Sequence, residues 1–173
     1  MTYYIGQALG ILAIAMTILM FQLKNKTHML FVNIVSNAAI AASDIFIKGE
    51  FKSGAIICLI AIVQIIASFI HDKKGTEVPF IEKIIFLVFY IAGGLVGLTG
   101  PKEILPIIAA IFYMVAMFQK DPQKIRCILL GNMSPWVVYF LFPFNTSIFA
   151  QIAGIISSLI GIYRYRKQKM EVQ

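Results

Sequence analysis

The chain contains long runs of apolar residues separated by short, mostly basic loops. A helix needs about 20 residues to cross the ~30 Å hydrocarbon core of a bilayer, because it rises ~1.5 Å per residue. Seven stretches approach this length, and each is continuously apolar rather than alternating, which favours helices over strands. They are residues 3–21, 28–47, 52–70, 80–98, 104–119, 126–142 and 148–163. We therefore expect an all-α integral membrane protein with seven transmembrane helices.

The composition supports this class. Of the 173 residues, 60% are hydrophobic and 13% are charged, whereas a soluble domain is about half apolar and a quarter charged. A net charge of +7 would suit a nucleic-acid-binding protein if the basic residues formed one stripe, but here they flank apolar runs. The lipid bilayer is therefore the expected partner, and nucleic acid is not.

The fifth and sixth stretches are short, and a six-helix protein with these two fused is the main alternative. Pro122 lies between them in QKDPQK and argues against fusion, because proline interrupts a helix. Seven spans also divide the basic residues unevenly, whereas six would scatter them. One side of the membrane receives only Lys48, Lys52 and Lys102, while the other receives twelve: Lys24, Lys26, Lys73, Lys74, Lys83, Lys120, Lys124, Arg126, Arg164, Arg166, Lys167 and Lys169. The positive-inside rule then predicts an external N-terminus and a cytoplasmic C-terminus.

The motif MFQ occurs twice, at residues 20–22 and 117–119, each time where an apolar run gives way to lysines. Aligned on this motif, residues 13–22 and 110–119 share five identities in ten positions. Chance similarity between apolar strings is the alternative to an internal repeat. Three helices end on the opposite side of the membrane from where they begin, so a second copy that followed directly would be inverted. One further helix between the copies gives both the same orientation in the membrane. We therefore expect a first repeat over residues 1–75, a linker helix over 76–100, and a second repeat with a basic tail over 101–173.

This arrangement resembles the PQ-loop superfamily, which includes the SWEET sugar transporters. The closest resemblance is to the YgjV-type bacterial inner-membrane proteins, and GQALG at 6–10 and FQLKNK at 21–26 carry it. The resemblance implies a multi-pass protein of the bacterial inner membrane with a SWEET-like 3+1+3 fold. It also implies a gating role for Gln22 and Gln119, although each follows phenylalanine where the superfamily has proline.

Polar residues within apolar spans mark candidate binding positions, since they are costly in hydrocarbon. The second stretch carries Asn33 and Asn37 on one face, and the third carries Gln64. The sixth carries Asn132, Pro135, Trp136 and Tyr139 at helical spacing. We expect Asn33, Asn37, Gln64, Asn132, Trp136 and Tyr139 to bind a solute near the membrane midplane.

Each of these positions also has a structural interpretation. Asparagines commonly tie membrane helices together. Trp136 could fill core volume instead of stacking on a solute. Pro135 should kink its helix, either statically or as a moving gate. Serines such as Ser157 and Ser158 often bond to their own helix, and the small residues of AGGLVG at 92–97 suit close helix packing.

We therefore expect a transporter or facilitator of a small neutral or weakly polar solute. The alternatives are a membrane scaffold or sensor that does not transport, and a vitamin-precursor carrier resembling the PnuC transporters. The sequence shows no catalytic constellation and no metal-ligand spacing, so we expect no enzyme activity, no metal and no cofactor. The sequence does not decide whether the chain forms a homo-oligomer.

Overall fold

The computed structural model describes residues 2–48, 53–96, 100–101, 104–141 and 147–171. All regular secondary structure in these residues is helical, which confirms the predicted all-α class. The seven helices are α1 (Thr2–Gln22), α2 (Lys26–Lys48), α3 (Ser53–Lys74), α4 (Phe80–Leu95), α5 (Ile104–Met117), α6 (Pro122–Leu141) and α7 (Ser147–Glu171). Each apolar stretch corresponds to one helix. The bounds differ most at α6, which begins four residues earlier than expected, and at α7, which continues into the basic tail.

N-capping residues mark the starts of α2 and α6 at the basic end of the bundle. The side-chain oxygen of Asn25 accepts a hydrogen bond from the backbone N–H of Thr27 at the start of α2 (2.9 Å). Asp121 accepts an equivalent bond from the N–H of Gln123 at the start of α6 (2.9 Å). Pro122 takes the first helical position, where its missing N–H costs nothing. The structure thus confirms that the fifth and sixth helices are separate.

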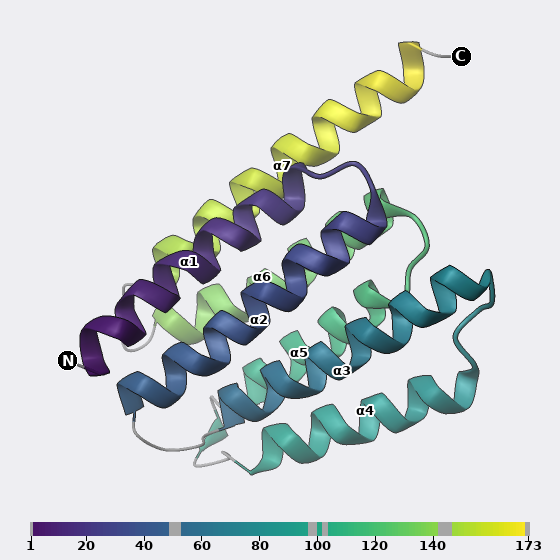
Figure 1. Ribbon diagram of the computed structural model, residues 1–173. Coiled ribbons are helices and arrows are strands. Elements are labelled where there is room, and N and C mark those ends of the chain that lie inside the picture. Colours follow the sequence, from purple (N-terminus) through teal and green to yellow (C-terminus); the bar gives the residue numbers. More distant parts are fainter. Residues whose placement is uncertain (1, 49–52, 97–99, 102–103, 142–146, 172–173) are drawn as a thin grey trace.

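The helices form an antiparallel bundle of two layers (Figure 1). In this view α1, α2, α3 and α4 lie side by side in the near layer, and α7, α6 and α5 lie behind them. Consecutive helices contact each other along the chain, and α1 also contacts α7, while α3 also contacts α5. The bundle is therefore closed between α1 and α7, and α5 packs against α3, α4 and α6.

The largest buried cluster draws residues from five helices near the basic end of the bundle. It contains the methionines of both MFQ copies, Met20 and Met117, together with Ile65 of α3. The other members are Phe21, Met29, Leu30, Ala116, Ile125, Leu129 and Met133. The methionines of the two motifs thus lie in one shared core.

Close packing at α4 depends on two glycines. A Cβ atom on Gly93 would lie 2.9 Å from the side chain of Ile60 in α3. A Cβ on Gly94 would lie 2.5 Å from the side chain of Ile107 in α5. These contacts confirm the predicted packing role for this part of AGGLVG, while residues 97–99 lie outside the described residues.

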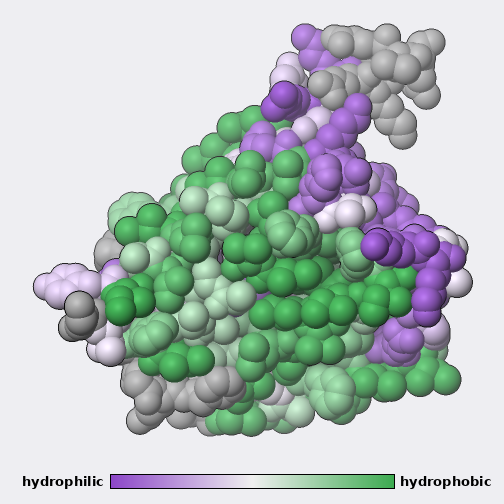
Figure 2. Space-filling view, viewed as in Figure 1, coloured by the Kyte–Doolittle hydropathy of each residue, from purple (hydrophilic) through white to green (hydrophobic). Residues whose placement is uncertain are grey.

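The surface is that of a protein surrounded by lipid. Apolar side chains cover most of the visible face, and hydrophilic residues gather at one end, including the projecting end of α7 (Figure 2). Three described helical segments are long and apolar enough to cross a membrane individually: Thr2–Gln22, Ala55–Lys74 and Ile148–Lys167. The apolar helix α5 is shorter, with 14 residues.

Candidate functional site

A buried polar network lies between α2 and α5. The side-chain amide of Asn33 donates a hydrogen bond to the hydroxyl of Tyr113 (2.8 Å), and the amide of Asn37 donates to the same hydroxyl (3.0 Å). Asn37 also donates to the side-chain oxygen of Asn33 (2.9 Å). Both asparagines are buried. Their spacing of four residues places both amides on the face of α2 that meets α5.

Gln64 extends this network to α3 and α4. It is fully buried, and its amide donates to the backbone carbonyl of Met114 on α5 (2.8 Å). The hydroxyl of Tyr90 on α4 donates to the side-chain oxygen of Gln64 (2.7 Å). The rings of Tyr90 and Tyr113 meet edge to face, with centroids 6.5 Å apart. We call Asn33, Asn37, Gln64, Tyr90 and Tyr113 the polar network.

The predicted site residues of α6 reach α5 at a neighbouring position. The amide of Asn132 donates to the backbone carbonyl of Ala109 (2.7 Å), one helical turn before Tyr113. Trp136 and Tyr139 pack edge to face on α6, with ring centroids 5.7 Å apart. The structure thus joins Asn33 and Asn37 directly, and it links Gln64 to them through Tyr90, whose ring contacts that of Tyr113. Asn132 reaches the same helix one turn away.

The three predicted gating residues have different surroundings. The amide of Gln22 donates to the backbone oxygen and the hydroxyl of Ser157 (2.9 and 2.8 Å), which joins α1 to α7. Gln119 follows the end of α5 and donates to the carbonyl of Val115 (3.1 Å). Pro135 lies inside α6, which continues on both sides of it. The two glutamines of the repeated motif are therefore not equivalent in their contacts.

Ser157 and Ser158 bond to other helices. Ser157 donates to the carbonyl of Ile18 on α1 (3.0 Å), and Ser158 donates to the carbonyl of Arg126 on α6 (3.3 Å). The expectation that they bond to their own helix is therefore wrong. Each hydroxyl faces a neighbouring backbone, where the interhelical bond is available.

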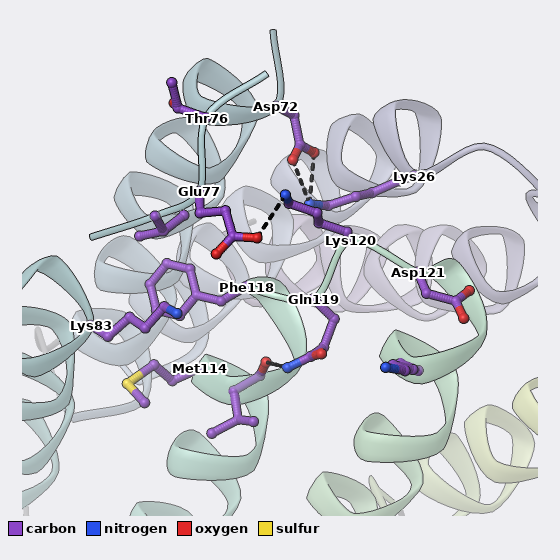
Figure 3. A pocket seen from close by; sticks show the side chains of 13 residues that line it. Lys26, Asp72, Thr76, Glu77, Lys83, Met114, Phe118, Gln119, Lys120 and Asp121 are labelled. Carbon is purple, nitrogen blue, oxygen red and sulfur yellow. Dashed lines mark hydrogen bonds and ion pairs between the residues drawn. The ribbon is translucent and has the colours of Figure 1, made fainter. Parts of the chain in front are cut away.

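A pocket of about 440 Å³ opens at the basic end of the bundle. Its volume lies within the range of small-molecule sites. Figure 3 shows Met114 on the opposite side of the pocket from Asp72 and Thr76. Because the backbone carbonyl of Met114 accepts the hydrogen bond from Gln64, this wall of the pocket adjoins the polar network. The remaining lining residues are Lys26, Glu77, Val78, Lys83, Val115, Phe118, Gln119, Lys120, Asp121 and Lys124.

Two ion pairs lie at this pocket (Figure 3). The ammonium of Lys26 on α2 contacts both carboxylate oxygens of Asp72 on α3 (2.8 and 2.7 Å). Lys120 contacts Glu77 (3.0 Å) and so links the α5–α6 connection to the α3–α4 connection. The hydrogen bond and positive charge of Lys120 lower the pKa of the exposed Glu77 carboxyl below its usual value, and Lys83 adds to this lowering.

Arg126 has a structural position that sequence reasoning missed. The sequence suggests a charge in a cytoplasmic loop, but the residue lies inside α6 and is 1% exposed. Its guanidinium donates to the carbonyls of Phe21 and Leu23 at the end of α1, and it lies 4.6 Å from the ring centre of Tyr165. It therefore joins α1, α6 and α7, where its charge also complements the carbonyl end of α1.

Sequence reasoning also missed Tyr90 and Tyr113. Both are tyrosines within apolar stretches, and a hydroxyl buried in a membrane protein needs a hydrogen-bond partner. That need is the signal that could have placed them beside the asparagines and Gln64.

Comparison with known proteins yields a family but no close relative. No curated protein matches the chain, and no solved structure matches it. The model of the Imp-YgjV family matches residues 4–169, nearly the whole chain, and is described as a bacterial inner membrane protein. Together with the apolar surface and the spanning helices, this match places the protein in the inner membrane of a bacterium. The chain belongs to the Imp-YgjV family of bacterial inner membrane proteins.

Proposed function

We propose that the protein carries a small neutral, polar solute across the membrane and that the polar network binds this solute. The observation that carries the proposal is the network itself, in which five uncharged polar side chains from α2, α3, α4 and α5 meet inside an apolar bundle. Amides and phenols both donate and accept hydrogen bonds, so they can exchange partners with hydroxyl or amide groups of a solute. Polar residues in such positions commonly mark substrate pathways.

Matching contacts in the two halves support the 3+1+3 arrangement. Ser36 donates to the carbonyl of Ala13 (3.1 Å), and Asn132 donates to the carbonyl of Ala109 (2.7 Å). Both residues of the second bond lie 96 positions after those of the first. The helix-start bonds of α2 and α6 are separated by the same 96 positions. Transporters built from repeats place their binding site at the interface between the repeats.

The contacts between the halves are also paired. Ser157 of α7 donates to the carbonyl of Ile18 on α1, and Gln64 of α3 donates to the carbonyl of Met114 on α5. Ile18 and Met114 are again 96 positions apart. This relation supports two parallel repeats about an axis along the membrane normal, with α4 as the linker.

The pocket supports access from one side of the membrane. It lies at the end that carries the basic loops, which the positive-inside rule assigns to the cytoplasm. We infer that the solute reaches the network from the cytoplasm through this pocket. In this orientation the N-terminus is external and the C-terminus is cytoplasmic.

The projecting basic end of α7 favours a second candidate, a membrane scaffold that binds a partner. The two candidates differ in what the polar network does. A transporter binds a solute there, whereas a scaffold uses the network only to hold its helices together.

A thermal-shift screen of the purified protein against small sugars, polyols and amides tests the proposal. A solute that binds the folded state raises the melting temperature as its concentration increases.

Variants of the predicted site residues then test where the solute binds. Asn37→Ala should weaken the affinity for such a solute by about 1–2 kcal/mol, because one hydrogen bond is lost. Trp136→Ala should abolish the stabilisation if the indole stacks on the solute. Thr27→Ala, at an exposed position of α2, is the control. If Asn37→Ala lowers stability but leaves affinity unchanged, the network is structural and the proposal is wrong.

A further inference from the structure

Ser68 of α3 is a buried residue whose hydroxyl lacks a partner. The residue is 1% exposed, and its Oγ has no hydrogen-bond partner among the described residues. A buried hydroxyl without a hydrogen bond destabilises the folded protein, because the group has lost its bonds to water. Serines in membrane helices usually avoid this cost by bonding to the preceding turn. Other buried serines of this protein, Ser36 and Ser158, are bonded to neighbouring helices.

The position of Ser68 connects the pocket to the polar network. Asp72 lines the pocket and Gln64 belongs to the network. Ser68 lies four residues from each, so the three side chains form a line along one face of α3. The same face meets α5 at Met114, which lines the pocket through its side chain and accepts the bond from Gln64 through its backbone.

The side chains of this line are charged at the pocket and uncharged at the polar network. At the pocket, the charge of Asp72 is neutralised by Lys26. Further in, Ser68, Gln64 and the remaining members of the network are uncharged. A charged solute would leave its water shell there without an opposite charge to compensate. A neutral solute with hydroxyl or amide groups would instead find donors and acceptors at each step.

We propose that the Ser68 hydroxyl binds the solute as it passes from the pocket to the polar network, and that the solute is a small, neutral, hydroxyl- or amide-bearing molecule. This inference rests on the transport function proposed above. Met114 and Phe118 are apolar residues of the pocket lining, and on this proposal their side chains turn aside to let the solute through. Methionine is flexible enough to turn aside, so the passage opens without unfolding of a helix.

Cysteine accessibility tests the passage separately from transport. The background carries Cys58→Ala and Cys127→Ser, which remove both native thiols. Ser68→Cys is compared with Ser158→Cys, an equally buried position whose hydroxyl is bonded. The probe is iodoacetamide, itself a small neutral amide, and modification is followed by intact mass. Ser68→Cys should react more than about tenfold faster, because the reactive thiolate forms only where water enters.

A block of the pocket shows whether the reagent arrives by this route. Val115 lines the pocket and is 38% exposed, so Val115→Trp adds bulk there without filling the core. It should slow the modification of Ser68→Cys, whereas Val88→Trp on the exposed face of α4 should not. Equal, slow modification of Ser68→Cys and Ser158→Cys would overturn the inference. Fast modification that Val115→Trp leaves unchanged would overturn it as well, since the passage would then avoid the pocket.

Removal of the hydroxyl provides a second measurement that does not depend on the cysteine variants. Ser68→Ala breaks no hydrogen bond of the described structure, so it should leave the melting temperature of the free protein unchanged or raised. It should still reduce the stabilisation by the solute found in the screen. A reduced melting temperature with unchanged solute stabilisation would contradict a binding role. Solute binding that depends on Asn37 but not on Ser68 would leave the transport proposal standing and remove this inference alone.

Discussion

The side-chain amide of Asn33 lies 2.8 Å from the hydroxyl of Tyr113, although the two residues are 80 positions apart in the chain. This bond joins α2 to α5 through uncharged polar groups. Asn37 donates to the same hydroxyl. Tyr113 is therefore the side chain at which both asparagines of α2 meet α5.

Tyr113→Phe tests the contribution of this point to stability. The substitution keeps the ring but removes the acceptor of two amides, so both asparagines lose a partner. We expect the free energy of unfolding to fall by about 1–3 kcal/mol. Thermal unfolding of the purified protein measures the change, with Tyr163→Phe at a 74% exposed position as the control. Equal melting temperatures for the two variants would mean that the buried amides find other partners.

Gly161→Ala tests the close approach of α7 and α1. A Cβ at this position would lie 2.4 Å from the backbone oxygen of Phe21, which cannot turn aside as a side chain would. The helices must separate, and we expect a loss of about 1–3 kcal/mol of stability. Gly100→Ala is the matched control, because an added Cβ there meets nothing within 4 Å. An unchanged melting temperature for Gly161→Ala would show that α1 and α7 are further apart than described.

Arg126→Lys tests whether the guanidinium holds α1, α6 and α7 together. Lysine keeps the charge but cannot reach two carbonyls with a planar fork. We expect a loss of about 1.5–3 kcal/mol of stability, as for other hydrogen bonds to charged groups. Arg166→Lys, at an exposed position of α7, should have little effect. If both substitutions are equally mild, Arg126 serves only as a cytoplasmic charge, as its sequence position suggests.

Cysteine labelling in intact cells tests the orientation of the bundle. Thr2→Cys at the start of α1 and Lys74→Cys at the end of α3 place thiols at opposite ends. A membrane-impermeant maleimide added outside should label Thr2→Cys and spare Lys74→Cys until the cells are opened. The reverse pattern would place the basic end outside, in conflict with the positive-inside rule, and would move the pocket to the external face.

Hydropathy was sufficient to predict the helices but not where each one ends. A run of apolar residues reports the part of a helix that lies in lipid. The α7 helix continues to Glu171 through Arg164, Arg166 and Lys167 because backbone hydrogen bonding does not require apolar side chains. At α6 the start is set by Asp121 and Pro122, which precede the apolar run.

The polar network was predictable only in part. Asn33, Asn37 and Gln64 stand out because an amide in an apolar span needs a partner. The partners did not stand out, because helices that are apolar on every side carry almost no periodic signal of which face points inward. Tyr113 also lies in the repeated segment 110–119. In the 96-residue spacing of the matching hydrogen bonds it corresponds to Thr17, so comparison of the two segments does not identify Tyr113 as a partner of the asparagines.

Solute flux through proteoliposomes tests the central claim most directly. Vesicles containing the protein are mixed with hyperosmotic solutions of small neutral solutes such as glycerol, urea, erythritol and ribose, and light scattering follows their shrinkage and re-swelling. The account predicts that at least one solute re-swells these vesicles faster than protein-free vesicles. It further predicts that Asn37→Ala and Ser68→Ala slow this flux while Thr27→Ala does not. Re-swelling rates equal to those of protein-free vesicles for every neutral solute, with a folded protein in the membrane, would contradict it.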